Sequence, residues 1–317
     1  MLPLAYTESV ELKEHLHHID ALRQQILCIP LSPKMELKAR WDAKTTCIYS
    51  SLALSHTLLS RGQVVKILAN QTRHIPTEYR DVLSYEKALD YIQELWTASP
   101  KPITVSTVRT LAEIALGLPS EAIERAVSAV EPSVRTLLEY LENQTDHPVI
   151  QAGIALCLLS TGAAIPSDSG IVARLIATAF LAKYGYNIRG LLTIEKHWLI
   201  NESSYTVALS SLQKQGNLNH WLLFYVSTME ANLQERFEDI SNTNVHQDFP
   251  SEFWELNERQ KGILTHLSDP ASSITNRKVQ QLFTVSQITA SRDLAKLNTL
   301  GLIFPHGKGR SINYTHA

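Results

Sequence analysis

Apolar residues recur at three- and four-residue spacing over most of the chain, with little of the strict alternation that is typical of strands. Residues 133–142 are an example, because Val134, Leu137 and Leu141 fall on one helical face and Ser133 is placed to cap the helix start. The pattern predicts one helix after another, and therefore a mainly α protein.

The helical pattern stops at a polar segment. Residues 241–255 include Ser-Asn-Thr-Asn and later Phe-Pro-Ser, with few apolar side chains that could hold the segment to a core. We therefore predict a helical domain over residues 1–240, a linker over 241–255 and a second domain over 256–317.

The second domain has the pattern of three short helices. Ile263, Leu264 and Leu267 give the first helix an apolar face. Thr275 is placed to cap a second helix that runs to about Phe283.

A third helix is expected from Ser286, its capping residue, to about Leu300. Ile288, Leu294 and Leu297 are its predicted buried residues. Gly301 follows, as is typical of a helix C-terminus.

A hairpin is predicted after that glycine. Residues 302–304 and 311–314 have strand character, and they bracket His-Gly-Lys-Gly-Arg at 306–310, a glycine-rich tip with two positive charges. Three helices followed by such a hairpin predict a small α+β domain.

The segments 275–277, 289–294 and 307–310 resemble those of winged helix-turn-helix domains. The resemblance implies that the third helix enters the DNA major groove, while the hairpin and the helix ends contact phosphates. The candidate base-reading residues are Gln287, Thr289 and Arg292, and the candidate phosphate contacts are Arg277, Lys278, Lys308 and Arg310. Winged helices also dock other proteins, so a protein-interaction adaptor is an open alternative.

Upstream, His-Pro-Val-Ile-Gln-Ala at 147–152, an apolar helix and residues 170–174 resemble the core of the Fic family. Residues 194–205 and 221–225 add to this resemblance, which covers the chain from Ala39 and places a Fic core at about 100–230. Fic proteins are helical, and most of them transfer AMP from ATP to a protein hydroxyl.

The family motif, H-P-F-x-[DE]-G-N-G-R-x-x-R, aligns without a gap on residues 163–174, and only Gly170 and Arg174 match it. The substituted positions of this degenerate loop include Ala163 for the histidine, Ser167 for the acid, Asp168 for a glycine, Ser169 for the asparagine and Ile171 for the first arginine. The resemblance therefore implies that no catalytic residue is in place.

Each substitution removes a chemical role that the family motif supplies. Ala163 has no atom to accept a proton, whereas a general base contributes about 10² to 10⁴ in rate. Ser167 is a poor ligand for magnesium. On the opposite alternative, an atypical adenylyltransferase, Asp168 or His147 would support nucleotide transfer. ATP and magnesium would be cofactors only in that case, and otherwise none is expected.

Two further departures concern regulation and substrate docking. Many Fic proteins have an inhibitory helix, [ST]-x-x-x-E-[GN], whose glutamate pairs with the last motif arginine. In the matching segment, residues 45–50, Tyr49 replaces the glutamate, and we expect it either to lie over Arg174 or to pack as an ordinary core tyrosine. Residues 116–134 also lack the strand-turn-strand pattern of the flap that aligns a target peptide.

Charge is unevenly distributed along the chain. The net charge is −2, but Asn257–Ala317 contains eight Lys or Arg against three Asp or Glu, or +5. The upstream residues hold the other 21 basic and 28 acidic side chains, or −7. An acidic body joined to a basic module favours DNA as the partner.

Composition restricts the class of protein further. Hydrophobic residues at 44% and charged residues at 19% are typical of a soluble globular protein. No secretory signal or membrane-spanning stretch is evident, and three scattered cysteines indicate a reducing cytoplasm. His15, His17 and His18 lack further ligands at metal-binding spacing, so no metal site is expected.

These features together predict a cytoplasmic, DNA-binding transcriptional regulator. Its catalytically degenerate Fic-like domain would act as a scaffold, a homodimerisation surface or a ligand sensor. The adenylyltransferase and the adaptor are the two alternatives.

Overall fold

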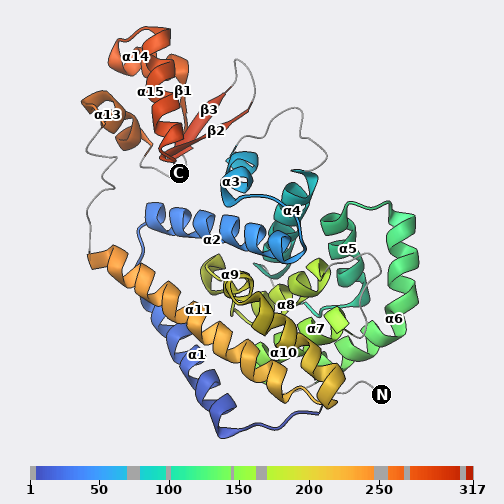
Figure 1. Ribbon diagram of the computed structural model, residues 1–317. Coiled ribbons are helices and arrows are strands. Elements are labelled where there is room, and N and C mark those ends of the chain that lie inside the picture. Colours follow the sequence, from blue (N-terminus) through green and yellow to red (C-terminus); the bar gives the residue numbers. More distant parts are fainter. Residues whose placement is uncertain are drawn as a thin grey trace. The chain divides into compact units, whose positions relative to one another are not determined.

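The computed structural model describes residues 5–69, 79–97, 101–143, 146–161, 170–245, 256–267, 272–307 and 312–316 (Figure 1). The chain divides into two compact units. We call residues 1–29 with 40–240 the helical unit, and residues 30–39 with 241–317 the C-terminal unit. A mainly α protein with a small sheet near the C-terminus is the fold class that the sequence predicts, and this prediction is confirmed.

The helical unit is built from α1 to α11, of which α2 and α11 extend past its limits. The bounds are α1 Val10–Cys28, α2 Pro33–Leu54, α3 Arg61–Ala69, α4 Arg80–Thr97, α5 Val105–Leu116, α6 Ser120–Asn143, α7 Pro148–Thr161, α8 Ile171–Lys183, α9 Ile194–Ile200, α10 Glu202–Gln215 and α11 Asn219–Val245. Helix α11 thus continues five residues into the segment expected as a linker.

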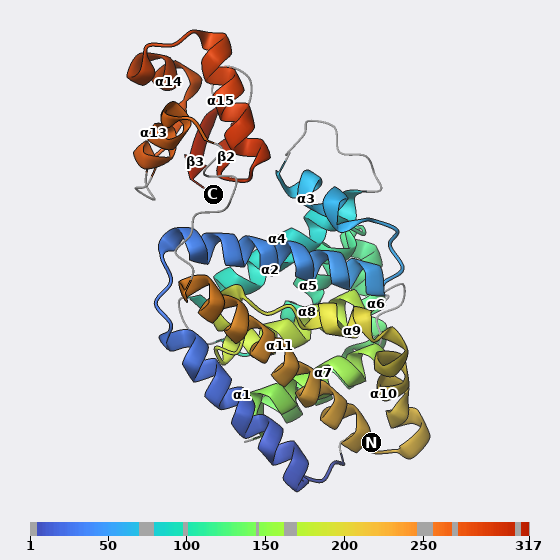
Figure 2. The same cartoon turned by 60° about the vertical axis from the view of Figure 1, so that its left-hand side comes forward.

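Helices α7 and α8 form the centre of the helical unit, and the other helices surround them in both views (Figures 1 and 2). Every residue of α7 from Val149 to Leu159 is buried. A helix that is apolar on all sides requires such a central position. Helix α11 packs closely on α7, because a Cβ at Gly153 would lie 2.9 Å from the Tyr225 ring and Trp221 donates a hydrogen bond to the Gly153 carbonyl at 2.7 Å.

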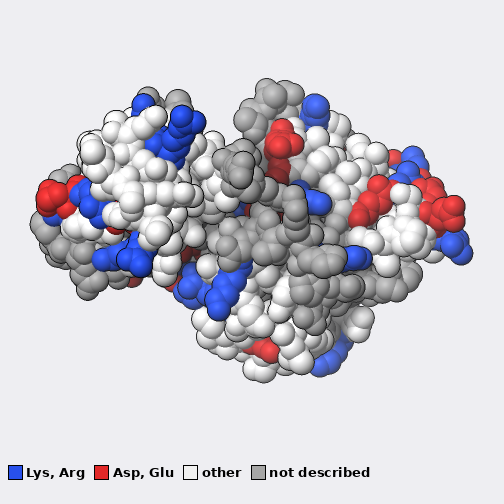
Figure 3. Space-filling model, turned by 90° about the horizontal axis from the view of Figure 1, so that it is seen from above, with Lys and Arg blue, Asp and Glu red and all other residues white. Residues whose placement is uncertain are grey.

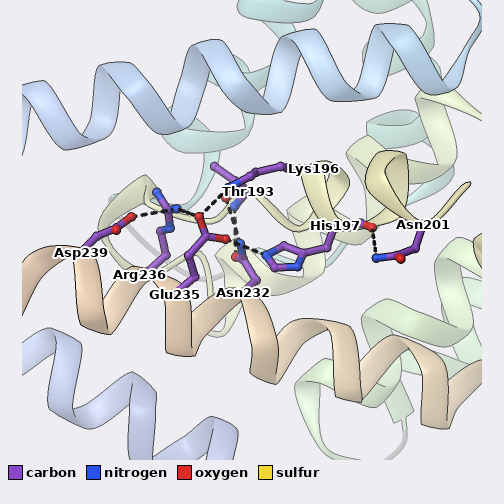
Figure 4. Close-up of polar contacts among 8 residues, drawn as sticks. All are labelled: Thr193, Lys196, His197, Asn201, Asn232, Glu235, Arg236 and Asp239. Carbon is purple, nitrogen blue, oxygen red and sulfur yellow. Dashed lines mark hydrogen bonds and ion pairs between the residues drawn. The ribbon is translucent and has the colours of Figure 1, made fainter.

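Helix α9 is fixed to α11 by polar side chains (Figure 4). Glu235 accepts hydrogen bonds from Lys196 at 2.5 Å and lies 2.9 Å from the His197 ring nitrogen. Asn232, fully buried, accepts from the Thr193 backbone N–H at 3.1 Å and donates to the Thr193 hydroxyl at 2.9 Å. Because buried polar groups are costly unless paired, these contacts determine where α9 lies.

The predicted helix start at Ser133 is wrong. Helix α6 runs continuously from Ser120 to Asn143 through Pro132. A proline inside a helix removes one backbone hydrogen bond. The complete burial of Val134, Leu137 and Leu141 stabilises the helix across that break. The same helix fills most of residues 116–134, in line with the predicted lack of a strand-turn-strand flap.

The C-terminal unit combines helices with a three-stranded antiparallel sheet of order β1-β3-β2. Its elements are α13 Glu258–His266, β1 Ile274–Thr275, α14 Asn276–Phe283, α15 Gln287–Thr299, β2 Ile303–His306 and β3 Asn313–His316. Ile274 pairs with Tyr314, and Ile303 pairs with His316. The predicted hairpin is confirmed as β2 and β3, whereas the two-residue β1 is an element that the sequence pattern did not indicate.

The predicted helix ends in this unit are confirmed. The Thr275 side chain accepts from the backbone N–H of Lys278, and the Ser286 side chain accepts from that of Thr289. Gly301 has φ +68°, a left-handed conformation that favours glycine after a helix. These caps define where α14 and α15 begin, and therefore which side chains their first turns expose.

The buried side chains of α15 differ from the prediction at one position. Leu294 and Leu297 are buried as expected, but Ile288 is 65% exposed. The core of the unit is closed instead by Ala290 and by residues from α13, β1 and β2. The first turn of α15 therefore presents a large apolar side chain to solvent.

Candidate functional site

The loop that aligns with the Fic motif is described only at its end. Ala163, Ser167, Asp168 and Ser169 lie outside the described residues. Gly170 caps α8 with φ +83° and provides no side-chain cap. Ile171, the first residue of α8, is buried. The described part of the loop thus ends at the start of α8, where the backbone of residue 170 has a positive φ that favours glycine.

Arg174, the last motif position, points into the protein. Its side chain is 3% exposed. Nε donates to Ser51 Oγ at 2.7 Å, and Nη2 donates to the Ser51 carbonyl at 2.9 Å and to Ser55 Oγ at 2.5 Å. A Cβ on Gly170 would lie 2.9 Å from Nη1, so the guanidinium also fills the space beside the glycine. Arg174 therefore joins α8 to α2.

The guanidinium lies in a buried polar cluster of α2, α4, α9 and α10. Burial raises the pKa of the Glu195 carboxyl, the Cys47 thiol and the Tyr205 hydroxyl, and the positive charge of Arg174 opposes that rise in each case. Burial also raises the pKa of the fully buried Tyr85 hydroxyl, and Arg174 opposes that rise. Arg174 is thus a positive charge beside buried titratable groups, and it favours their ionised forms against the effect of burial.

Tyr49 lies in α2, as the comparison with the inhibitory helix requires, and is half-buried. It precedes Ser51 by two residues, which places it on nearly the opposite side of the helix. The structure brings Ser51 and Ser55, rather than Tyr49, to Arg174. The sequence signal for these contacts is a pair of serines four residues apart at the end of α2. The family motif does not include this pair.

His147 lies at the other end of α7 from the motif loop. Its Nδ1 accepts from the Val149 backbone N–H at 3.2 Å, and its Nε2 lies 3.2 Å from Asp20 and 3.1 Å from the Tyr186 hydroxyl. The 14 residues of α7 span about 21 Å. Burial lowers the pKa of His147, although Asp20 opposes this. Both ring nitrogens have hydrogen-bond partners, so His147 fixes the start of α7.

A cavity of about 150 Å³ lies between α2, α4, α8 and α9, one to two helical turns from Arg174. Lys44 lines it but pairs with Glu86 at 3.1 Å and Asp90 at 2.8 Å. Arg189 also lines it but donates to the carbonyls of residues 27 and 29. Lys44 therefore joins α2 to α4, and Arg189 holds the C-terminal end of α1.

Among the residues that the structure describes, no three His, Cys, Asp or Glu side chains are grouped so as to hold a metal ion. His15 and His18 of α1 instead lie 2.5 Å and 3.0 Å from the two carboxylate oxygens of Glu230 in α11. Within the described part of the chain, no helix combines the length and the apolar character that crossing a bilayer requires.

The C-terminal unit has an exposed face along the whole of α15. Its members are uncharged or basic, and they recur as adjacent pairs four residues apart: Gln287, Ile288, Ser291, Arg292, Ala295, Lys296 and Thr299. The one acidic residue of α15, Asp293, is 3% exposed and faces inward. We call these seven residues the α15 face.

Asp293 attaches α15 to α13. Arg259 donates two hydrogen bonds to its carboxylate, and Gln260 Nε2 donates a third at 2.8 Å. Although burial alone would raise the pKa of Asp293, these hydrogen bonds lower it below its ordinary value. The carboxylate is therefore ionised and fully bonded, which leaves no acidic group on the α15 face.

A second contact fixes the start of α15 to α14. Asn276 Nδ2 donates to Ser291 Oγ at 2.8 Å and to the Gln287 carbonyl at 3.4 Å. Gln280 Nε2 in turn donates to Asn276 Oδ1 at 2.6 Å. The angle between the two helices is thus set by paired polar groups that lie beside the α15 face.

The sequence-predicted DNA contacts fall in three groups. Gln287 and Arg292 belong to the α15 face, but Thr289 is half-buried and its hydroxyl lies 3.0 Å from that of Ser286, so it takes part in the cap. Arg277 and Lys278 are exposed in the first turn of α14. Lys308 and Arg310 lie outside the described residues.

Each of the two acidic side chains described between residues 256 and 316 is paired with a basic one, Glu258 with Lys261 and Asp293 with Arg259. Figure 3 shows Lys and Arg side chains at several places on the left-hand body, which is this unit, and acidic side chains at its outer edge. Glu258, whose side chain is 91% exposed, is paired with Lys261 at 2.9 Å. The charge distribution therefore leaves the basic side chains beside the α15 face accessible.

Solved structures of Fic proteins resemble the chain. A Fic family protein from Desulfovibrio desulfuricans G20 is 15% identical over 100% of this chain and 98% of its own, with a TM-score of 0.65. Fic-1 from C. elegans is 18% identical over 72% of this chain and 71% of its own, with a TM-score of 0.61. A Fic domain containing signaling protein from Bacteroides thetaiotaomicron is 18% identical over 73% of this chain and 98% of its own, with a TM-score of 0.55.

At these identities the similarity establishes the fold. The chain therefore has the fold of Fic family proteins, as its sequence predicts. No protein-family model matches the sequence, and no curated protein matches it.

Proposed function

We propose that the protein is a DNA-binding regulator in which the Fic-like body has a non-catalytic role. The α15 face is the observation that supports this function best. Apart from Ile288 and Ala295, the face presents polar and basic side chains, and it contains no acid. It is narrow enough for the major groove. Its central residues, Ser291 and Ala295, are small enough to let the helix backbone approach the bases.

The surroundings of this face fit the same function. Arg277 and Lys278 begin α14 on exposed positions, where Lys and Arg contact phosphates in helix-turn-helix proteins. The positive charge of residues 257–317 would favour association with DNA, and it would make binding strongly dependent on salt.

The body is proposed to be non-catalytic because its motif lacks a proton acceptor at Ala163 and a metal ligand at Ser167. Arg174, the motif arginine that remains, donates to Ser51 and Ser55. A triphosphate would have to displace buried hydrogen bonds to reach it, which costs about 1 to 3 kcal/mol for each group left unpaired.

Binding of the full-length protein to a pool of random DNA duplexes tests this function. We expect affinity to fall steeply as salt rises, and the double variant Arg277→Ala/Lys278→Ala to bind about tenfold more weakly with a shallower salt dependence, because each lost phosphate contact lowers the slope by about one. Fluorescence anisotropy at three or four salt concentrations measures both quantities.

The matched control is Arg125→Ala/Arg135→Ala, which removes the same charge from exposed positions of α6 in the helical unit. We expect the control to bind DNA like the unaltered protein. Equal weakening in both double variants would indicate a general charge effect. No binding at low salt would contradict the proposal and favour the protein-interaction adaptor.

A further inference from the structure

Ile288 is the exception on the α15 face. It is the one large apolar side chain there, it is 65% exposed, and it lies in the first turn of α15. Its neighbours on the face, Gln287, Ser291 and Arg292, are polar. A branched apolar residue in this position gains little for the folded unit, because the core is closed without it.

We infer that Ile288 contacts the C5 methyl group of a thymine and makes the protein select thymine at one position of its DNA site; this inference rests on the DNA-binding function proposed above. The thymine methyl is the apolar group that base pairs present in the major groove. Contact with it removes the exposed part of Ile288 from water, which is favourable.

Arg292 adds a second element to the site. It follows Ile288 by four residues on the same face, so the two side chains are displaced by about 6 Å along the helix, which matches about two base-pair steps of 3.4 Å. An arginine in the major groove donates two hydrogen bonds to guanine O6 and N7. The selected sequence would therefore place a guanine about two steps from the thymine.

The frame around Ile288 is rigid enough for such selection. Ser286 caps the turn, and Asn276 bonds the Gln287 carbonyl and the Ser291 hydroxyl. The Ile288 backbone is thus held between two fixed neighbours. A side chain on a fixed turn discriminates bases better than one on a mobile loop.

The test begins with sequences selected by the full-length protein from a random pool. In the best sequence, each thymine is replaced singly by deoxyuracil, which removes only the methyl group. We expect one replacement to weaken binding by the unaltered protein about fourfold, the value for one buried methyl. Ile288→Ala should bind the same sequence about tenfold more weakly and should no longer respond to that replacement.

Ile200→Ala is the matched control, because Ile200 is 67% exposed in the helical unit and loses the same atoms. Thermal unfolding of each variant checks that it is folded. If the unaltered protein and Ile288→Ala respond equally to every deoxyuracil replacement, the inference is overturned. The proposed DNA-binding function is not affected by that result. Failure of the unaltered protein to bind any DNA would instead overturn the proposed function.

Discussion

At the scale of single residues, Arg174 has a structural explanation that the family resemblance does not supply. It matches the last motif position, and it donates hydrogen bonds to Ser51 and Ser55. Its charge also compensates Glu195, a carboxyl that is 3% exposed. An arginine with these contacts stabilises the packing of α8 on α2.

Arg174→Ala should therefore destabilise the helical unit by about 2 to 4 kcal/mol. The substitution removes the charge opposite Glu195 and leaves the Ser51 carbonyl without this donor. Urea denaturation measures the loss. Arg125→Ala, at an exposed position of α6, should change stability by less than about 0.5 kcal/mol. Equal stabilities for the two variants would contradict the structural role.

The sequence predicts single residues well where the rule is local. Thr275, Ser286 and Gly301 could be identified because a cap depends on a few neighbouring positions. Ile288 could not, because its exposure depends on how Ala290 and other elements close the core. The partners of Arg174 lie about 120 residues upstream, and no local pattern indicates them.

At the scale of elements, an ion pair with a buried carboxylate contributes to the orientation of α15. Asp293 receives hydrogen bonds from Arg259 and Gln260 of α13. The pKa of Asp293 is lower in the folded state than the ordinary pKa of an aspartate, which is about 3.9. The hydrogen bonds to Asp293 therefore stabilise the fold at pH values above about 3.9, and this contribution is lost as pH falls through the lower, folded-state pKa.

We therefore expect Asp293→Asn to destabilise the C-terminal unit by about 1 to 3 kcal/mol at pH 6, and the difference from the unaltered protein to shrink below pH 4. The NMR methyl signals of Ile263 and Leu294, both in the core of this unit, report its unfolding. Glu258→Gln, at a side chain that is 91% exposed, should show no such pH dependence. A difference that does not shrink at all as pH falls below the ordinary pKa of an aspartate would show that the ion pair is not its cause.

Elements with strong periodicity could be predicted from the sequence, and short or interrupted ones could not. Helices α13, α14 and α15 follow from their apolar spacing and caps. Strand β1 has two residues and exists through its pairing with β3. Helix α6 crosses Pro132 because tertiary burial of its apolar face exceeds the local cost of the proline.

At the scale of the whole molecule, the similarity to Fic proteins lies in the fold and not in the side chains of the motif loop. The chain shares the Fic fold with proteins that are 15 to 18% identical to it. At such low identities the similarity extends to the fold alone. Activity depends instead on a few side chains, and in this chain residues 163, 167, 169 and 171 differ from the motif.

The whole protein should therefore give no ATP-dependent labelling of itself or of proteins in a lysate, in the presence of magnesium. Ala163 cannot accept a proton, and His147 lies at the N-terminal end of α7, a helix about 21 Å long, with both ring nitrogens hydrogen-bonded. Radiolabelled ATP measures this, with an active Fic enzyme assayed in parallel. Labelling that Asp168→Ala abolishes, while the variant stays folded, would support the adenylyltransferase instead, because it would make Asp168 the group that replaces the missing acid.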